Sequence, residues 1–435
     1  DKQIAEAADD FTRIALKAKA AKDYFLLVGP PGTGKTSCAL KKMVETFYKE
    51  EGAQILLLSY TNRAVDEICK ALSSIRPEVD FIRVGSELSC DENYRDHLIE
   101  NELATCMRRT EVCERINRCR ILVGTVASIS GKPELFRLKH FDVAIVDEAT
   151  QILEPQLLGI LCAKGENGKE GVGKFILIGD HKQLPAVVLQ NSEQSEVYDE
   201  ALSAVGLKNL KDSLFERLYR TARQHTDAHR TYDMLCRQGR MHPEVALFAN
   251  QAFYEGRLLP VGLPHQLEDS GNINRLSFYP SQPEPMGSSA KTNHSEAKIA
   301  ARLAATVYKE HSEAFDASRT LGIITPYRSQ IALVKKEIEA LGIPELNQIL
   351  IDTVERFQGS ERDVIIYSFC VNYPYQLKFL SNLTEEDGIL IDRKLNVALT
   401  RARKQMLLTG VPTLLERNPL YKSLLKLIES LRNIA

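Results

Sequence analysis

Eight consecutive residues direct the interpretation of this sequence: Gly29-Pro30-Pro31-Gly32-Thr33-Gly34-Lys35-Thr36. They match the P-loop pattern at every specified position, and they follow the apolar run of residues 24–28, which predicts a buried strand. The glycines let backbone N–H groups turn inward onto phosphate oxygens, and the helix that follows offers its N-terminus to the same anion. The stretch therefore predicts a nucleotide site in which Lys35 reaches the β- and γ-phosphates and Thr36 is a ligand of Mg²⁺.

Apolar runs alternate with amphipathic or polar stretches along the whole chain. The predicted strands lie at residues 24–28, 55–58, 121–123, 143–146, 175–178, 321–324, 349–351, 364–367 and 406–408. This alternation is typical of parallel sheets covered by helices, so we predict an α/β fold. Two interruptions are a polar, helical insertion at about residues 86–120 and a Pro- and Ser-rich loop, expected to be flexible, at residues 280–293.

The composition limits the class of protein. The 435 residues include 56 Lys and Arg against 58 Asp and Glu, and the hydrophobic and charged fractions of 44% and 26% are those of a globular protein. No apolar run reaches the roughly 18 residues of a membrane span. Nine cysteines, an odd number, favour a reducing interior, so we expect an intracellular protein, cytoplasmic if bacterial or nuclear if eukaryotic. The net charge of −2 excludes a uniformly basic surface but not a local groove.

An acidic pair follows the predicted strand at residues 143–146. Asp147 at that position can hold Mg²⁺, and the adjacent Glu148 is placed to polarise an attacking water. Alone, such a pair is more often an acidic surface turn, but downstream of a P-loop the pattern becomes specific. Another strand ends in Gly179-Asp180-His181-Lys182-Gln183-Leu184-Pro185, where Gln183 can sense the γ-phosphate.

Further motifs follow in a fixed order. They are Gln238-Gly239-Arg240-Met241-His242-Pro243, Thr325-Pro326-Tyr327-Arg328-Ser329-Gln330, Asp352-Thr353-Val354-Glu355-Arg356-Phe357-Gln358-Gly359-Ser360-Glu361 and Asn396-Val397-Ala398-Leu399-Thr400-Arg401-Ala402-Arg403. Together with the P-loop and Asp147-Glu148-Ala149-Thr150-Gln151, they resemble the superfamily 1B (Upf-like) helicases over nearly the whole chain. The helicase module of the DNA replication nuclease-helicases is the most similar, because it has a comparable motif to Ser59-Tyr60-Thr61-Asn62-Arg63-Ala64-Val65-Asp66.

The resemblance implies two tandem RecA-like domains, predicted here at residues 1–230 and 231–435, with ATP and Mg²⁺ as cofactors. It assigns catalytic roles to Lys35, Asp147, Glu148, Gln183, Arg240 and Arg401, with the two arginines as fingers that neutralise charge on the transferred phosphoryl group. It assigns Mg²⁺ to Thr36 and Asp147. Nucleotide contacts extend to Ser37, to Glu361 near the sugar and phosphates, to Tyr327 as the residue that stacks on adenine, and to Gln3 as an adenine-reading glutamine.

The chain departs from the family pattern in two places. The family usually has Tyr where this chain has Gly239, which puts in doubt a packing contact beside Arg240 but not the finger itself. Family members generally carry a stalk and a small barrel before the P-loop, and 28 residues are too few for them. Because the first residue is Asp1 rather than Met, we expect the chain to be a segment of a longer protein with an upstream nuclease, zinc or accessory domain.

Family position also predicts the contacts to single-stranded nucleic acid, with DNA favoured over RNA. The candidates are Thr61, Asn62, Arg63, Thr125, Thr325 and Thr353. Their hydroxyl and amide groups suit phosphates, although the same groups also commonly cap helices. Cys90, Cys106, Cys113 and Cys119 all fall in the predicted insertion, but their spacing matches no metal signature.

Two functions remain open from the sequence. The first is an ATP-dependent 5′-to-3′ translocase and helicase acting on single strands, with polarity and DNA preference resting on the resemblance alone. The second is an ATP-driven switch or remodelling module that does not separate strands, or an RNA helicase of the same group. Strand-displacement assays would distinguish the first from the switch.

Overall fold

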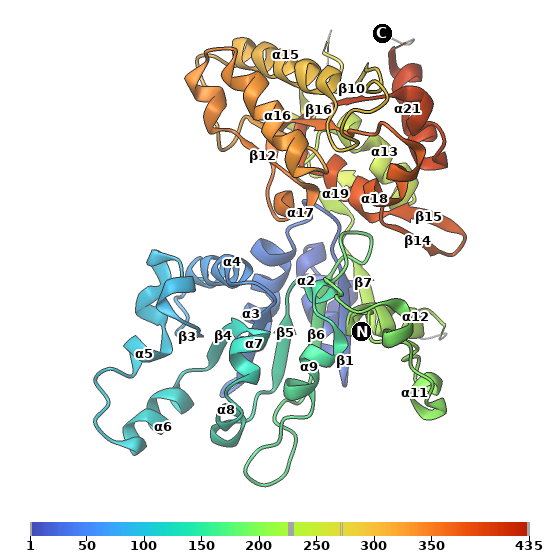
Figure 1. Ribbon diagram of the computed structural model, residues 1–435. Coiled ribbons are helices and arrows are strands. Elements are labelled where there is room, and N and C mark those ends of the chain that lie inside the picture. Colours follow the sequence, from blue (N-terminus) through green and yellow to red (C-terminus); the bar gives the residue numbers. More distant parts are fainter. Residues whose placement is uncertain (1, 225–229, 270, 272, 433–435) are drawn as a thin grey trace. The chain divides into compact units, whose positions relative to one another are not determined.

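The computed structural model describes residues 2–224, 230–269, 271 and 273–432, and for residues 2, 3 and 192 it describes the backbone alone. The chain forms two compact units (Figure 1). Unit 1 comprises residues 1–181 and 185–235, and unit 2 comprises residues 182–184 and 236–435. The short segment 182–184 therefore belongs with unit 2 although its neighbours in sequence belong to unit 1.

Within the described residues, unit 1 is built on a seven-stranded sheet in which every neighbouring pair is parallel. The strand order is β3-β4-β2-β5-β6-β1-β7. The strands are β1 Tyr24–Val28, β2 Ile55–Ser59, β3 Phe81–Val84, β4 Ile121–Thr125, β5 Val143–Val146, β6 Phe175–Gly179 and β7 Tyr232–Met234. The helices are α1 Lys2–Ala5, α2 Asp10–Ala20, α3 Lys41–Tyr48, α4 Asn62–Ser73, α5 Ile99–Glu102, α6 Arg109–Arg118, α7 Val126–Ser130, α8 Glu134–Leu138, α9 Glu154–Leu161, α10 Ser192–Ser195, α11 Glu200–Ala204 and α12 Leu214–Arg223.

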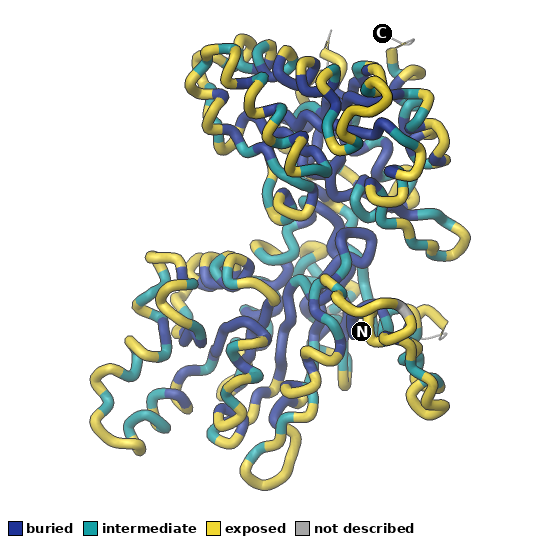
Figure 2. The backbone as a smooth tube through the Cα atoms, in the orientation of Figure 1, coloured by how far each residue is buried: buried dark blue, intermediate teal, exposed yellow. Residues whose placement is uncertain are grey.

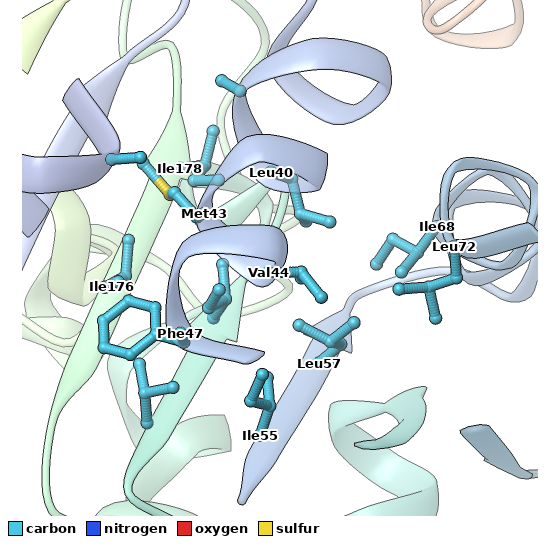
Figure 3. Close-up of a cluster of buried hydrophobic side chains, with 14 of the residues drawn as sticks. Leu40, Met43, Val44, Phe47, Ile55, Leu57, Ile68, Leu72, Ile176 and Ile178 are labelled. Atoms are coloured by element: carbon cyan, nitrogen blue, oxygen red, sulfur yellow. The ribbon is translucent and has the colours of Figure 1, made fainter. Parts of the chain in front are cut away.

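Helices cover both faces of this sheet, and strand β1 shows why its sequence is apolar throughout. Successive side chains of a strand point to opposite faces. Phe25 and Leu27 pack with α2, α3 and α4 in one buried cluster, part of which is drawn in Figure 3. Leu26 and Val28 pack with α7, α8, α9 and α12 in another. The central strands are dark blue along their length in Figure 2, as a parallel sheet covered on both faces requires.

Unit 2 is built on a five-stranded parallel sheet in the order β10-β16-β13-β11-β12, again for the described residues. Its strands are β10 Leu276–Pro280, β11 Leu321–Ile324, β12 Leu350–Asp352, β13 Arg362–Ser368 and β16 Ala402–Gly410. Two small additions are the parallel pair β8 Arg237–Gln238 and β9 Leu259–Pro260, and the hairpin β14 Leu383–Glu386 and β15 Ile389–Asp392. The helices are α13 Pro243–Phe253, α14 Pro264–Leu267, α15 His294–Glu310, α16 Arg328–Glu339, α17 Val354–Phe357, α18 Leu377–Leu380, α19 Arg393–Leu399, α20 Pro412–Leu415 and α21 Pro419–Arg432.

The loop predicted at residues 280–293, and expected to be flexible, starts within strand β10 and is tied down at its end. Asn293 is fully buried, and its side chain donates to Gln282 O and to Asn372 Oδ1, both at 2.9 Å. Gln376 Nε2 donates to Ala290 O at 2.7 Å. The partners lie about 80 residues further along the chain, so a composition-based interpretation of the loop could not include them.

The α/β fold with two tandem RecA-like domains is confirmed, including the helical insertion, which holds η2 Glu87–Ser89, η3 Glu92–His97, α5 and α6. Three strands of the two main sheets were missed, β3, β7 and β10, as were the small additional strands β8, β9, β14 and β15. Arg83, Asp233 and Ser277 interrupt the apolar runs of β3, β7 and β10, so the apolar signal of these strands is weak. A search of the described residues finds no helix with the length and apolar character that crossing a membrane demands.

Candidate nucleotide site and arginine cluster

The P-loop and the acidic pair meet because their strands are near neighbours. The P-loop follows β1, and Asp147 follows β5, while β6 lies between the two strands. All three strands run in the same direction, so their carboxyl ends share one edge of the sheet. In open α/β sheets this edge is where ligands bind.

Backbone conformation and a lysine contact shape the P-loop. Gly32 and Gly34 have φ values of 73° and 76°, a left-handed region that glycine adopts without strain. Lys35 starts the π-helical turn η1 Lys35–Leu40, which continues into α3. Its Nζ donates to Gly29 O at 2.7 Å. A Cβ at Gly29 would lie 2.1 Å from Lys35 Cγ, so the close approach requires glycine.

Thr36 and Asp147 are in direct contact. Thr36 Oγ1 donates to Asp147 Oδ2 at 2.5 Å, and the Asp147 side chain is buried. Burial raises the pKa of the Asp147 carboxyl, while the hydrogen bond from Thr36 and the charge of Lys35 act in the opposite direction. A desolvated carboxylate next to a hydroxyl is a pair of hard oxygen donors, which is what Mg²⁺ prefers, so these two residues fit the ion.

Glu148 has a backbone conformation that its side chain disfavours. Its φ of 50° is left-handed, where residues other than glycine and asparagine are strained. Asp147 Oδ1 accepts a hydrogen bond from Glu148 N at 2.9 Å and holds this turn. The strained residue lies directly after the buried strand β5, and backbone outliers of this kind cluster at functional sites.

In unit 2, the predicted finger Arg240 pairs with Glu361. Arg240 Nε donates to Glu361 Oε2 at 2.5 Å, and its Nη1 donates to Thr400 O at 3.3 Å. Burial would raise the pKa of Glu361, but the charges of Arg240, Arg403 and Arg401 outweigh burial, and the pKa lies below its ordinary value. Two residues predicted for the nucleotide site, Arg240 and Glu361, are thus brought together.

Arg401 has a buried side chain, unlike a cation at the protein surface. Its side chain is nearly fully buried, and Nε donates to Val397 O at 3.0 Å. Its Nη2 donates to Gln183 Oε1 at 3.5 Å, since Gln183 belongs to the 182–184 segment of unit 2. Asn396 Nδ2 donates to Lys182 O at 2.7 Å and anchors the same segment. Unit 2 therefore brings the predicted γ-phosphate sensor to one predicted finger.

The glycine that departs from the family pattern is accommodated by a neighbouring side chain. A Cβ at Gly239 would lie 3.2 Å from Leu263 Cδ1 and 3.9 Å from Val261 Cγ2. Leu263 is 40% exposed and can move outward. Leu263 therefore occupies part of the space in which a larger residue at position 239 would pack.

For Gly239→Tyr we expect an unfolding free energy within about 0.5 kcal/mol of the parent, because Leu263 can swing into solvent. A matched control is Gly322→Ala, whose Cβ would lie 2.7 Å from Cε1 of the fully buried Phe357 ring. Overpacking there should cost about 1–3 kcal/mol. Denaturant unfolding of the two variants measures both effects, and equal destabilisation would contradict the role given to Leu263.

Tyr327 and Gln3 are the two predicted adenine contacts. Tyr327 is half-buried and precedes α16, and its hydroxyl accepts a hydrogen bond from Gln376 Nε2 at 3.1 Å. Gln3 lies in α1, and its side chain falls outside the described residues. Both assignments stay predictions.

The candidate nucleic-acid contacts lie at strand ends and helix starts. Thr61 and Thr125 cap α4 and α7, because their hydroxyls accept from Ala64 N at 3.2 Å and Ser128 N at 3.1 Å. Thr353 precedes α17, and Thr325 is fully buried, with an Oγ1 that has no hydrogen-bond partner within the described ranges. Asn62 and Arg63 begin α4, where Arg63 is exposed. A hydroxyl that caps a helix keeps a lone pair or a proton with which it can also contact a phosphate. The caps therefore do not decide whether these residues only cap helices or also bind nucleic acid.

Two residues beside the arginine pair were not predicted as part of the site. Arg403 Nε lies 3.7 Å from Glu361 Oε1, and Arg403 Nη1 donates to Asp363 Oδ1 at 3.1 Å. The alternation Arg401-Ala402-Arg403 placed both arginines in one motif. Only the register of β13 against β16 shows that Arg403 lies beside the carboxylates of Glu361 and Asp363.

The four cysteines of the insertion are separate thiols. Cys90 and Cys119 are buried, whereas Cys106 and Cys113 are partly exposed. Across the part of the chain that the structure describes, no group of three or more His, Cys, Asp or Glu residues is arranged to hold a metal ion.

Comparison with known proteins adds the family context. An AAA domain family matches residues 7–112 and 99–191, and a second AAA domain family matches residues 210–413. The chain is 28% identical to the DNA replication ATP-dependent helicase/nuclease DNA2 of Bos taurus, covering 95% of this chain and 38% of that protein. It is 26% identical to the DNA polymerase alpha-associated DNA helicase A of Saccharomyces cerevisiae, covering 94% of this chain and 65% of that protein.

A solved complex of an arterivirus nonstructural protein 10 helicase with DNA matches with a TM-score of 0.44 at 15% identity, covering 92% of this chain and 62% of that one. A likeness at this level adds nothing to the assignment. The chain spans less than two thirds of the length of both curated relatives.

Proposed function

We propose that this chain, which belongs to the superfamily 1B helicases and is related to the DNA replication ATP-dependent helicase/nucleases, is the ATP-hydrolysing motor of a 5′-to-3′ DNA translocase. Binding of nucleotide and of nucleic acid follows from the family. The observation that carries the proposal is the contact of Thr36 with Asp147 beside the P-loop lysine. It brings together two sequence motifs 111 residues apart, which supports a single phosphate and metal site.

We propose that residues 29–37 bind the phosphates of ATP. Lys35 exchanges its bond to Gly29 O for the β- and γ-phosphate oxygens, and the N–H groups of the loop donate to the same anion. Thr36 and Asp147 would hold Mg²⁺, which when bound neutralises phosphate charge. Glu148 accepts a proton from, or orients, the attacking water. Its strained backbone fixes the carboxylate in the turn after β5.

The remaining roles belong to unit 2. Arg240 and Arg401 donate to the phosphoryl group as negative charge develops on it, and Gln183 reports the γ-phosphate to Arg401 through their hydrogen bond. Glu361 lies near the nucleotide sugar and phosphates, Tyr327 stacks on adenine, and Gln3 reads the adenine edge. The boundary between the two RecA-like domains is proposed near residue 230.

Single-stranded DNA is the proposed track. Thr61, Asn62, Arg63 and Thr125 would hold phosphates on unit 1, and Thr325 and Thr353 would hold them on unit 2. Translocation needs phosphate contacts on both domains, so that a nucleotide-driven change moves one set relative to the other. DNA is favoured over RNA because both named relatives are DNA helicases. A nuclease domain elsewhere in the protein is proposed because the Bos taurus relative is named a helicase/nuclease. A zinc or accessory domain is proposed from the family resemblance alone.

The test is a pair of assays on the full native protein. We expect single-stranded DNA to raise the ATPase rate at least about tenfold, because nucleic acid completes the site for the chemical step. We also expect displacement of a duplex that carries a 5′ single-stranded tail and not of one with a 3′ tail. Stimulation without displacement of either duplex would favour the switch module, and stimulation by RNA alone would favour an RNA helicase.

A further inference from the structure

Glu361 lies between two arginines but bonds to one of them. Its Oε2 accepts the hydrogen bond from Arg240 Nε at 2.5 Å. Its Oε1 lies 3.7 Å from Arg403 Nε, beyond hydrogen-bond distance. One carboxylate thus faces two guanidinium groups, and its present position favours Arg240.

Arg403 is anchored at one end and unsatisfied at the other. Nη1 donates to Asp363 Oδ1 at 3.1 Å, which holds the guanidinium in place. Nε is buried, and no described residue accepts a hydrogen bond from it. A buried donor without an acceptor costs free energy. A movement of the Glu361 carboxylate by less than 1 Å toward Arg403 would satisfy this donor.

Arg240 cannot serve two anions at once with the same donor. To donate from Nε to a phosphoryl oxygen, it must give up the Glu361 carboxylate. The Glu361 side chain is 44% exposed, so water screens part of its charge, but the carboxylate would still lose its hydrogen-bonded cation in the exchange. Three arginines, Arg240, Arg401 and Arg403, act on Glu361, so a second cation is close enough to take it over.

We propose that Arg403 is a positioning residue that takes over Glu361 when Arg240 leaves it for the phosphoryl group. This inference rests on the proposed function, because it assumes that Arg240 acts on ATP. Arg403 does not touch the nucleotide. It lowers the free energy needed to release the finger, and the return of Glu361 to Arg240 resets the site after product leaves.

The first experiment measures ATP turnover with single-stranded DNA in the full native protein. For Arg403→Gln we expect kcat to fall about tenfold, a change of about 1.4 kcal/mol in the barrier, while KM for ATP stays within about twofold, because the P-loop supplies ground-state binding. Arg403→Lys should recover part of the loss, since it keeps the charge. The control is Lys404→Gln, which removes the next cation of β16, paired with Glu268 at 3.4 Å, and should leave kcat unchanged.

A double-mutant cycle with Glu361 distinguishes a positioning role of Arg403 from a general structural role. In a Glu361→Gln background, Arg403→Gln should cause no further loss of kcat, because the amide no longer holds Arg240 by charge. An equal loss in both backgrounds, or unchanged kcat in Arg403→Gln, overturns the inference while leaving the proposed function intact.

A second experiment does not depend on ATPase activity, so the inference can be tested even if the proposed function fails. In an Arg240→Gln background Glu361 should already have moved to Arg403. Arg403→Gln should then shift the unfolding equilibrium constant at least about threefold more than it does in the parent chain. Denaturant unfolding measures both shifts, and additive effects would show that Glu361 does not change partners.

Discussion

Lys35→Ala should abolish nucleotide binding in any practical assay, with the dissociation constant for ATP raised at least about 100-fold, or about 2.7 kcal/mol. Lys35 supplies the only full positive charge of the P-loop sequence, and it is already turned onto the loop through Gly29 O at 2.7 Å. Truncating one partner of a charge-assisted pair that excludes water costs about 2–5 kcal/mol. Titration with a fluorescent ATP analogue, in Mg²⁺, measures the change.

Lys41→Ala is the matched control for this prediction. Lys41 begins α3, directly after the turn that Lys35 starts, and its Nζ donates to Ser74 O at 3.2 Å on the exposed surface. Its loss should leave ATP affinity unchanged within error. Thermal unfolding of both variants checks that they fold. Parent-like affinity in a folded Lys35→Ala protein would remove the P-loop from the proposed mechanism.

Glu148→Gln should keep nucleotide binding and lower turnover by about 10²–10⁴-fold, the usual contribution of a general base. The amide matches the carboxylate in size, so the turn after β5 and the Thr36–Asp147 contact should persist. Single-turnover hydrolysis gives the rate, and the nucleotide titration used for Lys35 gives the affinity. Normal turnover would assign water activation to another residue.

The strained backbone of Glu148 leads to a second prediction, which concerns the stability of variants at this position. Its φ of 50° costs about 1 kcal/mol or more for a residue with a Cβ, and glycine removes that cost. Glu148→Gly should therefore be more stable than Glu148→Ala by about 1 kcal/mol in denaturant unfolding, while both are inactive. Equal stability of the two variants would mean that the turn relaxes when the carboxylate is lost.

The local nucleotide chemistry was readable from sequence because its parts are contiguous. The P-loop carries its own glycines, lysine and threonine within eight residues, and Asp147 directly follows an apolar run of strand length. The strands at both positions were predicted correctly, since residues buried on both faces of a parallel sheet form unbroken apolar runs. Strands β3, β7 and β10 lack such runs, because Arg83, Asp233 and Ser277 interrupt them, and these strands were missed.

The neighbours of the predicted residues could not be read in the same way. The sequence placed Arg240, Glu361 and Arg403 in three motifs without saying that one carboxylate faces two arginines. The sequence also gave no reason for a glycine at position 239. In the structure, a Cβ there would lie 3.2 Å from Cδ1 of Leu263, a residue 24 positions further along the chain. Likewise, the bonds that join the 280–293 loop to Asn372 and Gln376 connect residues that are 79 and 86 positions apart.

By itself the sequence determined the α/β class and the P-loop pattern, and it named the residues proposed here to carry phosphate chemistry, because those properties depend on local spacing and on strand-length apolar runs. The tertiary structure alone decided which of these residues touch: Thr36 with Asp147, Gln183 with Arg401, and Glu361 with Arg240 rather than Arg403. Such contacts depend on strand order, on register and on the direction of each side chain, and no local pattern in a single chain encodes them.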